Sequence, residues 1–426
     1  MAADAQEGAA TVGVTTVPSS DRRAAVSLFS RLRTAQGQAD PFPVYEQLRA
    51  RGDVSRAPWG GLLVTSFDLC DRIVRGREWL EPDKRWREQQ GPGTRWNAPS
   101  SREMSSTLPA LNPPDHTRVR RAAGAFDRAT IERLGRTVSR VTDGLLDSLT
   151  ERLRSGEADF AALVSEELPI AAIGDWLGLP AADFPRLREL THDQVFTQEL
   201  LPSASQLALS DAATAELRVY FMNLVRERRA SPGDDPVSRW ITTWDAMEPD
   251  RDKADEGVYF LALFVLLAAL ETTSTMLTTT ALMLVERPEW WERLAARPEL
   301  VPGFVEETLR YDAPTHVISR VASDDRTLGD VEVRKDEMVH LMVGAAHRDP
   351  ARHADPDRFD PLRTPGHLAF SGGIHYCLGA PLARMEAHVM LRGLVARLPR
   401  LTLVRRPSWA PRVAFRRIQN LDVALA

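Results

Sequence analysis

The stretch FSGGIHYCLGAPLARME (370–386) decides the expected fold, and Cys377 stands at its centre. Gly372 and Gly373 precede the cysteine and permit a sharp turn with a close approach of the backbone to a flat partner. Pro381 suits the first turn of the helix that follows. The sulfur is therefore expected at a helix N-terminus, where free N–H groups and the helix dipole favour a thiolate. A thiolate held in this way suits a soft metal, and heme iron is one candidate.

Composition alone gives a lone cysteine a different interpretation, namely a small buried apolar residue. The order of the surrounding residues favours the metal ligand, because Phe, two residues, Gly, x, His, x, Cys, x, Gly resembles the heme-binding signature of the cytochrome P-450 superfamily. Ser371 departs from this pattern, since the family usually has glycine there. The resemblance implies that Cys377 is the axial ligand of the iron of heme b (iron protoporphyrin IX). It further implies cofactor-binding roles for Phe370, Gly373, His375 and Gly379.

Size and composition describe an ordinary globular protein. The 426 residues can bury a large core, and 43% hydrophobic with 27% charged residues is a typical soluble balance. A net charge of −5 and a pI near 6.1 argue against general nucleic-acid binding. With only Cys70 and Cys377, no disulfide framework is expected, and Cys70 is interpreted as a core residue.

The N-terminal segment carries Asp4 and Glu7 and no apolar core, so we do not expect a signal peptide. The longest apolar run, 258–270, is shorter than the roughly 20 residues that span a bilayer. These features predict a cytoplasmic protein that does not associate with membranes. Residues 1–25 are expected to form a disordered tail, and 26–426 a single domain.

Hydrophobic periodicity predicts a mainly α protein with a smaller β-rich region. Residues 255–285 predict a rod roughly 45 Å long that is apolar nearly all round and should cross the interior. Glu271 and Thr272 lie in its middle, where a buried acid is costly unless it has a function or a partner. Apolar residues at helical spacing over 131–153 predict a second long helix, whereas 317–343 alternates and predicts strands.

Two segments between the termini carry candidate binding residues. His116 and Arg120 are four apart, so they share one helix face and can together hold carboxylates, although a solvated basic face is the alternative. The long irregular segment 79–111 contains Trp86 and Trp96 and is interpreted as either a functional or an exposed loop. The resembled family places a substrate-covering loop at this point.

The resemblance covers the chain from about residue 40 to the C-terminus and implies the cytochrome P-450 fold, with a long central helix over a buried heme. The segment AALETT (268–273) resembles the oxygen-activation segment of that helix, and Ala269 replaces the usual glycine. Glu271 and Thr272 are by resemblance the catalytic acid–alcohol pair that delivers protons to bound oxygen. The implied ligands of the heme propionates are His116, Arg120, Arg320 and His375.

The resemblance also implies a structural charge triad of Glu307, Arg310 and Arg358, in which the first two share a helix face. The predicted substrate pocket combines the 79–111 loop with mostly apolar positions, as most ligand pockets do. These positions are Leu266, Ala269, Pro314, Thr315, His316, Val317 and Ile318.

By resemblance the chain is a heme-thiolate monooxygenase that activates O2 and oxidises a small organic molecule. The alternatives are oxidative cyclisation or coupling, a peroxide-driven enzyme, and a non-catalytic heme sensor. Retention of Glu271 and Thr272 favours the O2-dependent reaction. The bacterial-type motifs suggest natural-product biosynthesis as the setting.

No reductase motif is found in the sequence, so electrons from NAD(P)H are expected to arrive through a ferredoxin and a ferredoxin reductase, and the enzyme is expected to be a monomer. A basic patch on the cysteine side would meet an acidic ferredoxin, although solvated arginines on helices are the alternative. The arginines of this patch are Arg118, Arg121, Arg384 and Arg392.

Overall fold

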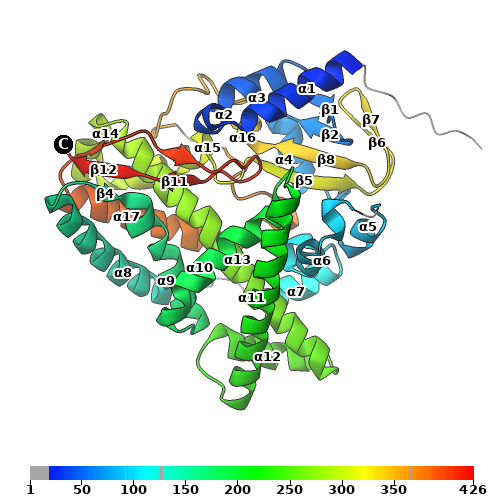
Figure 1. Ribbon diagram of the computed structural model, residues 1–426, viewed down its shortest axis with the longest axis horizontal. Helices are drawn as coiled ribbons and strands as arrows, with labels where there is room; N and C mark the ends of the chain where they lie inside the picture. The colour runs from blue at the N-terminus through cyan, green and yellow to red at the C-terminus, as the bar shows by residue number, and fades with distance from the viewer. Residues whose placement is uncertain (1–18, 92, 125–127, 364–365) are drawn as a thin grey trace, which may run out of the picture.

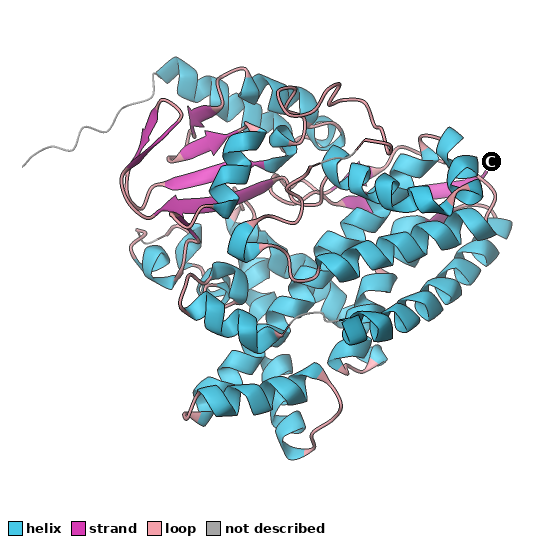
Figure 2. Cartoon of the chain, turned by 180° about the vertical axis from the view of Figure 1, so that it is seen from behind, coloured by secondary structure: helices cyan, strands magenta, loops and turns pink. Residues whose placement is uncertain are grey.

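The computed structural model describes residues 19–91, 93–124, 128–363 and 366–426, and most of this chain is helical (Figures 1 and 2). The helices are α1 (Ser19–Leu32), α2 (Ala35–Ala39), α3 (Phe42–Arg49), α4 (Phe67–Arg75), α5 (Lys84–Glu88), α6 (Pro99–Met104), α7 (Asp115–Ala123), α8 (Arg128–Arg154), α9 (Glu167–Leu177), α10 (Phe184–Gln194), α11 (Ala204–Ala230), α12 (Pro236–Met247), α13 (Arg251–Val285), α14 (Glu289–Ala296), α15 (Val301–Tyr311), α16 (Val343–Ala346) and α17 (Ala380–Arg397).

Helix α13 forms the centre of the molecule, and α8, α9, α11 and α17 pack around it or around each other (Figure 1). Its apolar residues face neighbours on every side, which is why the helix lies inside the core. The side chain of Asp250 caps it by accepting from the N–H groups of Asp252 and Lys253, so it begins four residues before the predicted start. Helix α13 is long and apolar enough to cross a membrane, but 72% of its most apolar window is buried in the fold, as in a core helix.

Most of the β-rich region lies to one side of the long helices, and a smaller group of strands lies beside the C-terminus (Figure 2). Its largest sheet has the order β1-β2-β8-β5-β3. The hairpin expected near Val54 is present, with Val54 opposite Val64. The strands are β1 (Val54–Arg56), β2 (Leu62–Val64), β3 (Trp79–Leu80), β4 (Ala158–Asp159), β5 (Val317–Ala322), β6 (Arg326–Leu328), β7 (Val331–Val333), β8 (Met338–Met342), β9 (Leu401–Leu403), β10 (Ser408–Trp409), β11 (Ile418–Asn420) and β12 (Asp422–Leu425).

The predicted disordered tail is too long. Residues 19–25 belong to α1, and the side chain of Ala25 is buried in the fold. Apolar residues along one face of α1 are buried against the part of the fold that contains the largest sheet. This packing stabilises the helix, and the small and polar residues at its start do not predict it. The rest of the predicted tail, 1–18, lies outside the described residues.

The 79–111 segment is also more regular than expected, because it contains β3 and the short helices α5 and α6. Asp83 begins α5 by accepting a hydrogen bond from the Trp86 N–H at 2.9 Å. The polar composition of the 79–111 segment does not predict these short elements, because short helices are stabilised mainly by tertiary packing.

Candidate active site

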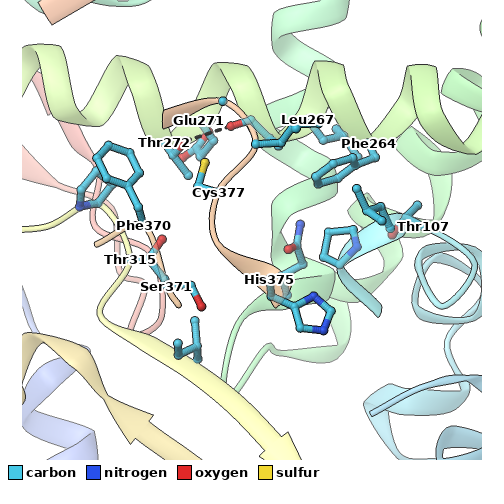
Figure 3. Close-up of a pocket in the computed structure, with 18 of the residues that line it drawn as sticks. Thr107, Phe264, Leu267, Glu271, Thr272, Thr315, Phe370, Ser371, His375 and Cys377 are labelled. Carbon is cyan, nitrogen blue, oxygen red and sulfur yellow. Dashed lines mark hydrogen bonds between the residues drawn. The ribbon is translucent and has the colours of Figure 1, made fainter. Parts of the chain in front are cut away.

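A cavity of about 440 Å³ lies between the middle of α13 and the Cys377 loop (Figure 3). Ala268 is exposed although it lies in the middle of a buried helix, because it faces this space. The 79–111 segment and the start of β5 complete the wall. The segment that the sequence marked as a possible substrate cover therefore does line the cavity.

Cys377 lies between the short 3-10 turn η7 (Gly373–His375) and the N-terminus of α17. Its N–H donates to the carbonyl oxygen of Phe370 at 3.0 Å. Gly373 has φ +60°, and a Cβ there would lie 2.7 Å from the carbonyl oxygen of Val74, so this turn requires glycine. Figure 3 shows the sulfur of Cys377 pointing toward the part of α13 that carries Thr272.

The thiol of Cys377 is not ionised by the protein alone. Burial raises its pKa, and the backbone N–H groups of Gly379 and Ala380 only partly oppose this effect. The N–H groups at the helix N-terminus therefore favour a thiolate, as expected, but burial opposes them more strongly. A bound cation is needed to hold the ionised sulfur, as a metal does for a ligating thiol.

Four predicted anion-binding residues line the same cavity: His116, Arg120, Arg320 and His375. The imidazole rings of His116 and His375 lie 4.4 Å apart between centroids. The buried Nε2 of His116 has no hydrogen-bond partner, which is an unusual state for a buried polar atom. Burial lowers the pKa of both histidines, that of His375 to about 3, so both rings are neutral at pH 7.

Glu81, which the sequence did not single out, lies among these residues. Its carboxylate forms an ion pair with Arg320 at 2.6 Å. Burial raises the pKa of Glu81 to about 7 even though Arg320 and Arg87 lower it. No local sequence pattern predicts a role for Glu81. It meets Arg320 because β3, which it follows, pairs with the distant strand β5.

These residues fit a flat group that carries two carboxylates and a thiol-binding metal. The unpartnered His116 Nε2 needs an acceptor, and Arg120 places a second donor group on the same wall. The cavity also reaches Cys377 and the two residues that follow it, Leu378 and Gly379. The donor set and the shape together match heme.

The predicted catalytic pair lies on the cavity wall. The hydroxyl of Thr272 donates to the carbonyl oxygen of Ala268 at 2.8 Å. The carboxylate of Glu271 is bound by Arg412, by His192 Nδ1 at 2.7 Å and by Arg417 at 3.4 Å. Burial acts to raise the pKa of Glu271, but these three partners lower it to about 2.

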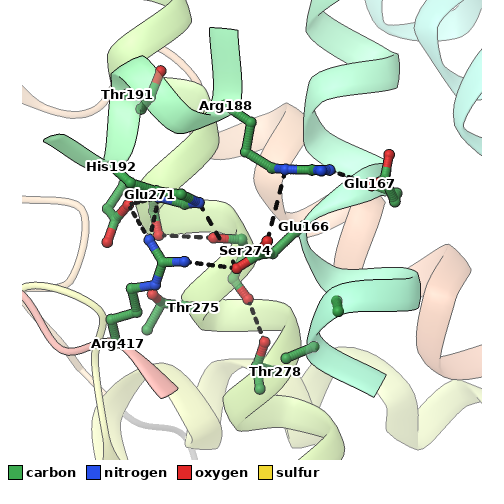
Figure 4. A network of polar contacts seen from close by, with 12 residues as sticks. Glu166, Glu167, Arg188, Thr191, His192, Glu271, Ser274, Thr275, Thr278 and Arg417 are labelled. Carbon is green, nitrogen blue, oxygen red and sulfur yellow. Dashed lines mark hydrogen bonds and ion pairs between the residues drawn. The ribbon is translucent and has the colours of Figure 1, made fainter. Parts of the chain in front are cut away.

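A network of charged groups continues from Glu271 away from the cavity (Figure 4). Arg417 also pairs with Glu166 at 2.7 Å, and Arg188 lies 3.7 Å from the same carboxylate. Arg188 in turn contacts Glu167, a partly exposed residue. The local sequence pattern marks the acid but not these partners, because they come from the start of α9, from α10 and from the C-terminal segment.

Most of the predicted pocket positions line the cavity, namely Ala269, Pro314, Thr315, Val317 and Ile318. Leu266 does not, and its side chain has no exposed surface. His316 does not either. It is fully buried and bonded to the Tyr45 hydroxyl at 2.8 Å and to Asp312 at 3.1 Å, so the predicted polar contact with a ligand is wrong.

The predicted charge triad is corrected in one member. Glu307 and Arg310 are fully buried and joined at 2.7 Å, as expected. The side chain of Arg358 is 70% exposed, and only its carbonyl oxygen accepts from Arg310. The third cation is Arg363, 3.2 Å from Glu307, because the chain turns so that the later arginine points inward.

Comparisons with known proteins agree with this site. The family model Cytochrome P450 matches residues 204–399. The monooxygenase PikC of Streptomyces venezuelae is 33% identical over 90% of this chain and 91% of its own length. The polyketide biosynthesis cytochrome P450 PksS of Bacillus subtilis is 28% identical over 91% of this chain and 96% of its own length.

Solved structures show the same fold. P450BioI, in complex with an acyl carrier protein ligated to hexadec-9Z-enoic acid, has a TM-score of 0.84 at 27% identity and covers 92% of this chain and 100% of its own. Ligand-free CYP164A2 of Mycobacterium smegmatis has a TM-score of 0.82 at 32% identity, covering 94% of this chain and 100% of its own.

The helical fold and the cysteine-facing cavity define a class of protein, the heme-thiolate monooxygenases. The chain belongs to the cytochrome P450 family. It is an oxidoreductase that uses heme iron, and enzymes of this family receive their electrons from redox partners.

Proposed function

We propose that this protein is a cytoplasmic, monomeric enzyme in which residues 19–426 act as one domain that holds heme b and oxidises a small organic molecule with O2. The mostly apolar cavity supports a small organic substrate. PikC and PksS support a role in natural-product biosynthesis, since the second is named for polyketide biosynthesis. Hydroxylation or a related oxidation is the proposed reaction.

The residue roles follow from the geometry of the cavity wall. Cys377 binds the iron through its sulfur, and the N–H groups of Gly379 and Ala380 stabilise that thiolate. Phe370 packs beside the cysteine loop, where the guanidinium carbon of Arg384 lies 4.4 Å from its ring. The residues proposed to bind the propionates are His116, Arg120, Arg320 and His375.

Bound heme supplies dioxygen activation at an iron whose thiolate ligand favours O–O cleavage. The chain must then supply protons and exclude water. Thr272 holds a hydroxyl at the cavity wall, and the Ala268 carbonyl orients it. Glu271 is ionised at pH 7 and hydrogen-bonded to His192 at 2.7 Å, so it can accept a proton from that ring. Its low pKa makes the protonated carboxyl short-lived and quick to release the proton toward Thr272.

We propose a ferredoxin with its ferredoxin reductase as the electron source, drawing on NAD(P)H. Two arginines of the predicted docking patch are engaged within the protein, Arg118 with Glu248 at 3.5 Å and Arg384 with Glu306 at 2.7 Å. Arg121 and Arg392 are exposed and form no ion pair among the described residues. These two therefore carry most of the proposed attraction, and added salt should slow reduction steeply.

One observation carries the proposal: His116, whose buried Nε2 has no hydrogen-bond partner, lines the same cavity as Cys377. The test is Cys377→Ser, measured by the absorption spectrum of the reduced protein with CO. We expect the variant to lose the red-shifted band of a thiolate-bound heme, because the sulfur is gone.

The matched control is Cys70→Ala, since Cys70 is the other free thiol and is fully buried beside Val64. This control should keep the wild-type spectrum. A Cys377→Ser protein with an unchanged spectrum would show that another side chain binds the iron.

A further inference from the structure

Two arginines and a tryptophan of the 79–111 segment, Arg87, Arg95 and Trp96, line the cavity close to one another. Arg87 lies in the last turn of α5, and Arg95 begins the 3-10 turn η1 (Arg95–Asn97). The guanidinium carbon of Arg95 lies 3.9 Å from the centroid of the Trp96 ring, and that of Arg87 lies 5.3 Å from it. The ring therefore holds both cations at the cavity wall.

Neither guanidinium forms an ion pair within the part of the chain that the structure describes. Arg95 makes one hydrogen bond, to the carbonyl oxygen of Glu199. The Glu199 carboxylate is already taken by the N–H groups of Val413, Ala414 and Phe415. A guanidinium has five N–H donors, so Arg95 retains donors for a ligand.

Arg87 is better satisfied than Arg95. It donates to the carbonyl oxygen of Pro82 at 2.7 Å and to the Ser101 hydroxyl at 2.9 Å. Glu81 and Asp83 also lie near enough to act on its charge. Burial and the neighbouring charge of Arg87 lower the pKa of Arg95 to about 10, so it is still a cation at pH 7. A cation in such a place is costly without a counter-ion.

Charge balance in the cavity singles out Arg95. Four arginines line it, namely Arg87, Arg95, Arg120 and Arg320. With heme bound, the two propionates and Glu81, which is about half ionised at pH 7, balance at most three of them. The other acids on the wall contribute nothing, because Glu271 is neutralised by Arg412, and burial raises the pKa of Glu386 to about 8 and keeps it protonated. One positive charge is left without a partner.

We propose that the substrate is an apolar organic acid whose single carboxylate binds Arg95 beside Trp96. This inference rests on the proposed function and names the substrate class of the same cavity. A carboxylate accepts two parallel hydrogen bonds from a guanidinium, which fixes the orientation of the molecule as well as binding it. The apolar remainder of the acid contacts side chains such as Leu108, Phe264, Val265 and Ile318.

The test compares acids with their methyl esters, which have nearly the same shape but no charge. Dodecanoic acid and 2-naphthylacetic acid are each paired with the methyl ester and titrated into the heme-loaded enzyme by calorimetry. We expect at least one acid to bind about tenfold or more tightly than its ester. In Arg95→Gln the acid should lose roughly 30-fold in affinity, as truncation of one partner in a buried charge pair does, and the ester should bind as before.

Arg85→Gln is the matched control, since Arg85 is an exposed arginine of the same segment. It should leave the binding of both ligands unchanged, whereas Arg95→Lys should restore part of the acid's affinity. The inference is overturned if no acid binds more tightly than its ester, or if Arg95→Gln weakens both equally. The CO spectrum of the wild-type enzyme separately tests the proposed function, because it depends on Cys377 and not on Arg95.

Discussion

At the scale of the residue, Ser371 departs from the family pattern at a position where this departure should lower the stability of the fold. Its φ is +57°, in the left-handed region where glycine is the usual residue. Its buried hydroxyl also has no hydrogen-bond partner. A serine held in this conformation introduces backbone strain into the turn before Cys377.

Replacing Ser371 by glycine should therefore stabilise the protein. We expect a gain of about 1 kcal/mol, from relief of the left-handed backbone and removal of the unpartnered hydroxyl. The thermal unfolding midpoint should rise by roughly 1–2 °C. Ser148→Gly, at an exposed helical serine of α8, should lower the midpoint instead, because glycine disfavours a helix. If both substitutions lower the unfolding midpoint, or both raise it, Ser371 is not strained in the way proposed.

At the scale of the element, Glu307 connects α15 to the irregular segment that leads to the cysteine loop. Its carboxylate pairs with Arg310, accepts the N–H of Asp360 at 2.8 Å and lies beside Arg363. Arg363 also donates to the carbonyl oxygens of Ala354 and Arg358, at 2.8 and 3.0 Å. The inward-pointing arginine thus holds this segment against α15.

Arg363→Ala should destabilise the protein far more than Arg358→Ala. Removing Arg363 leaves part of a buried carboxylate and several carbonyl oxygens without a partner, which costs about 2–3 kcal/mol. The side chain of Arg358 is mostly exposed and pairs with Asp360 only at 3.7 Å, so its loss should cost less than about 0.5 kcal/mol. Thermal unfolding of the two variants side by side makes the measurement. A larger loss of stability in Arg358→Ala than in Arg363→Ala would show that Arg358, as the sequence predicted, is the third member of the triad.

At the scale of the whole molecule, Glu271 joins parts of the chain that are far apart in sequence. It lies on α13, and its partners come from α10 and from the segment before β11. Its pKa is lowered to about 2 in the folded protein, against about 4.5 when unfolded. A carboxyl with a lowered pKa stabilises the fold above its unfolded pKa, and this contribution is lost as the pH falls toward 2.

Wild type should therefore be more stable than Glu271→Gln by about 3 kcal/mol at pH 7, and the difference should shrink between pH 4.5 and 2. The measurement is the unfolding midpoint of both proteins across this range. Glu289→Gln, at an exposed residue of α14, is the control and should follow wild type at every pH. A difference that persists unchanged at pH 2–3 would show that Glu271 acts by packing and not by its charge.

Local patterns predicted most elements of this protein correctly, and most of the candidate site residues line the cavity. The spacing around Cys377, the apolar length of α13 and the Val54 hairpin are properties of neighbouring residues, and the structure contains all three features. The errors concern long-range contacts. His316, for example, follows the same pattern as the pocket positions beside it, but a buried tyrosine and aspartate bind it elsewhere.

The sequence by itself determined where the chain turns and coils, because glycine, proline and the spacing of apolar residues act over a few positions. Only the tertiary structure decided which charges meet, as Glu81 does with Arg320 and Glu271 with Arg412. The physical reason is that a buried charge takes its partner from whatever element folding brings within a few ångströms, and its free energy depends on that partner and not on its sequence neighbours.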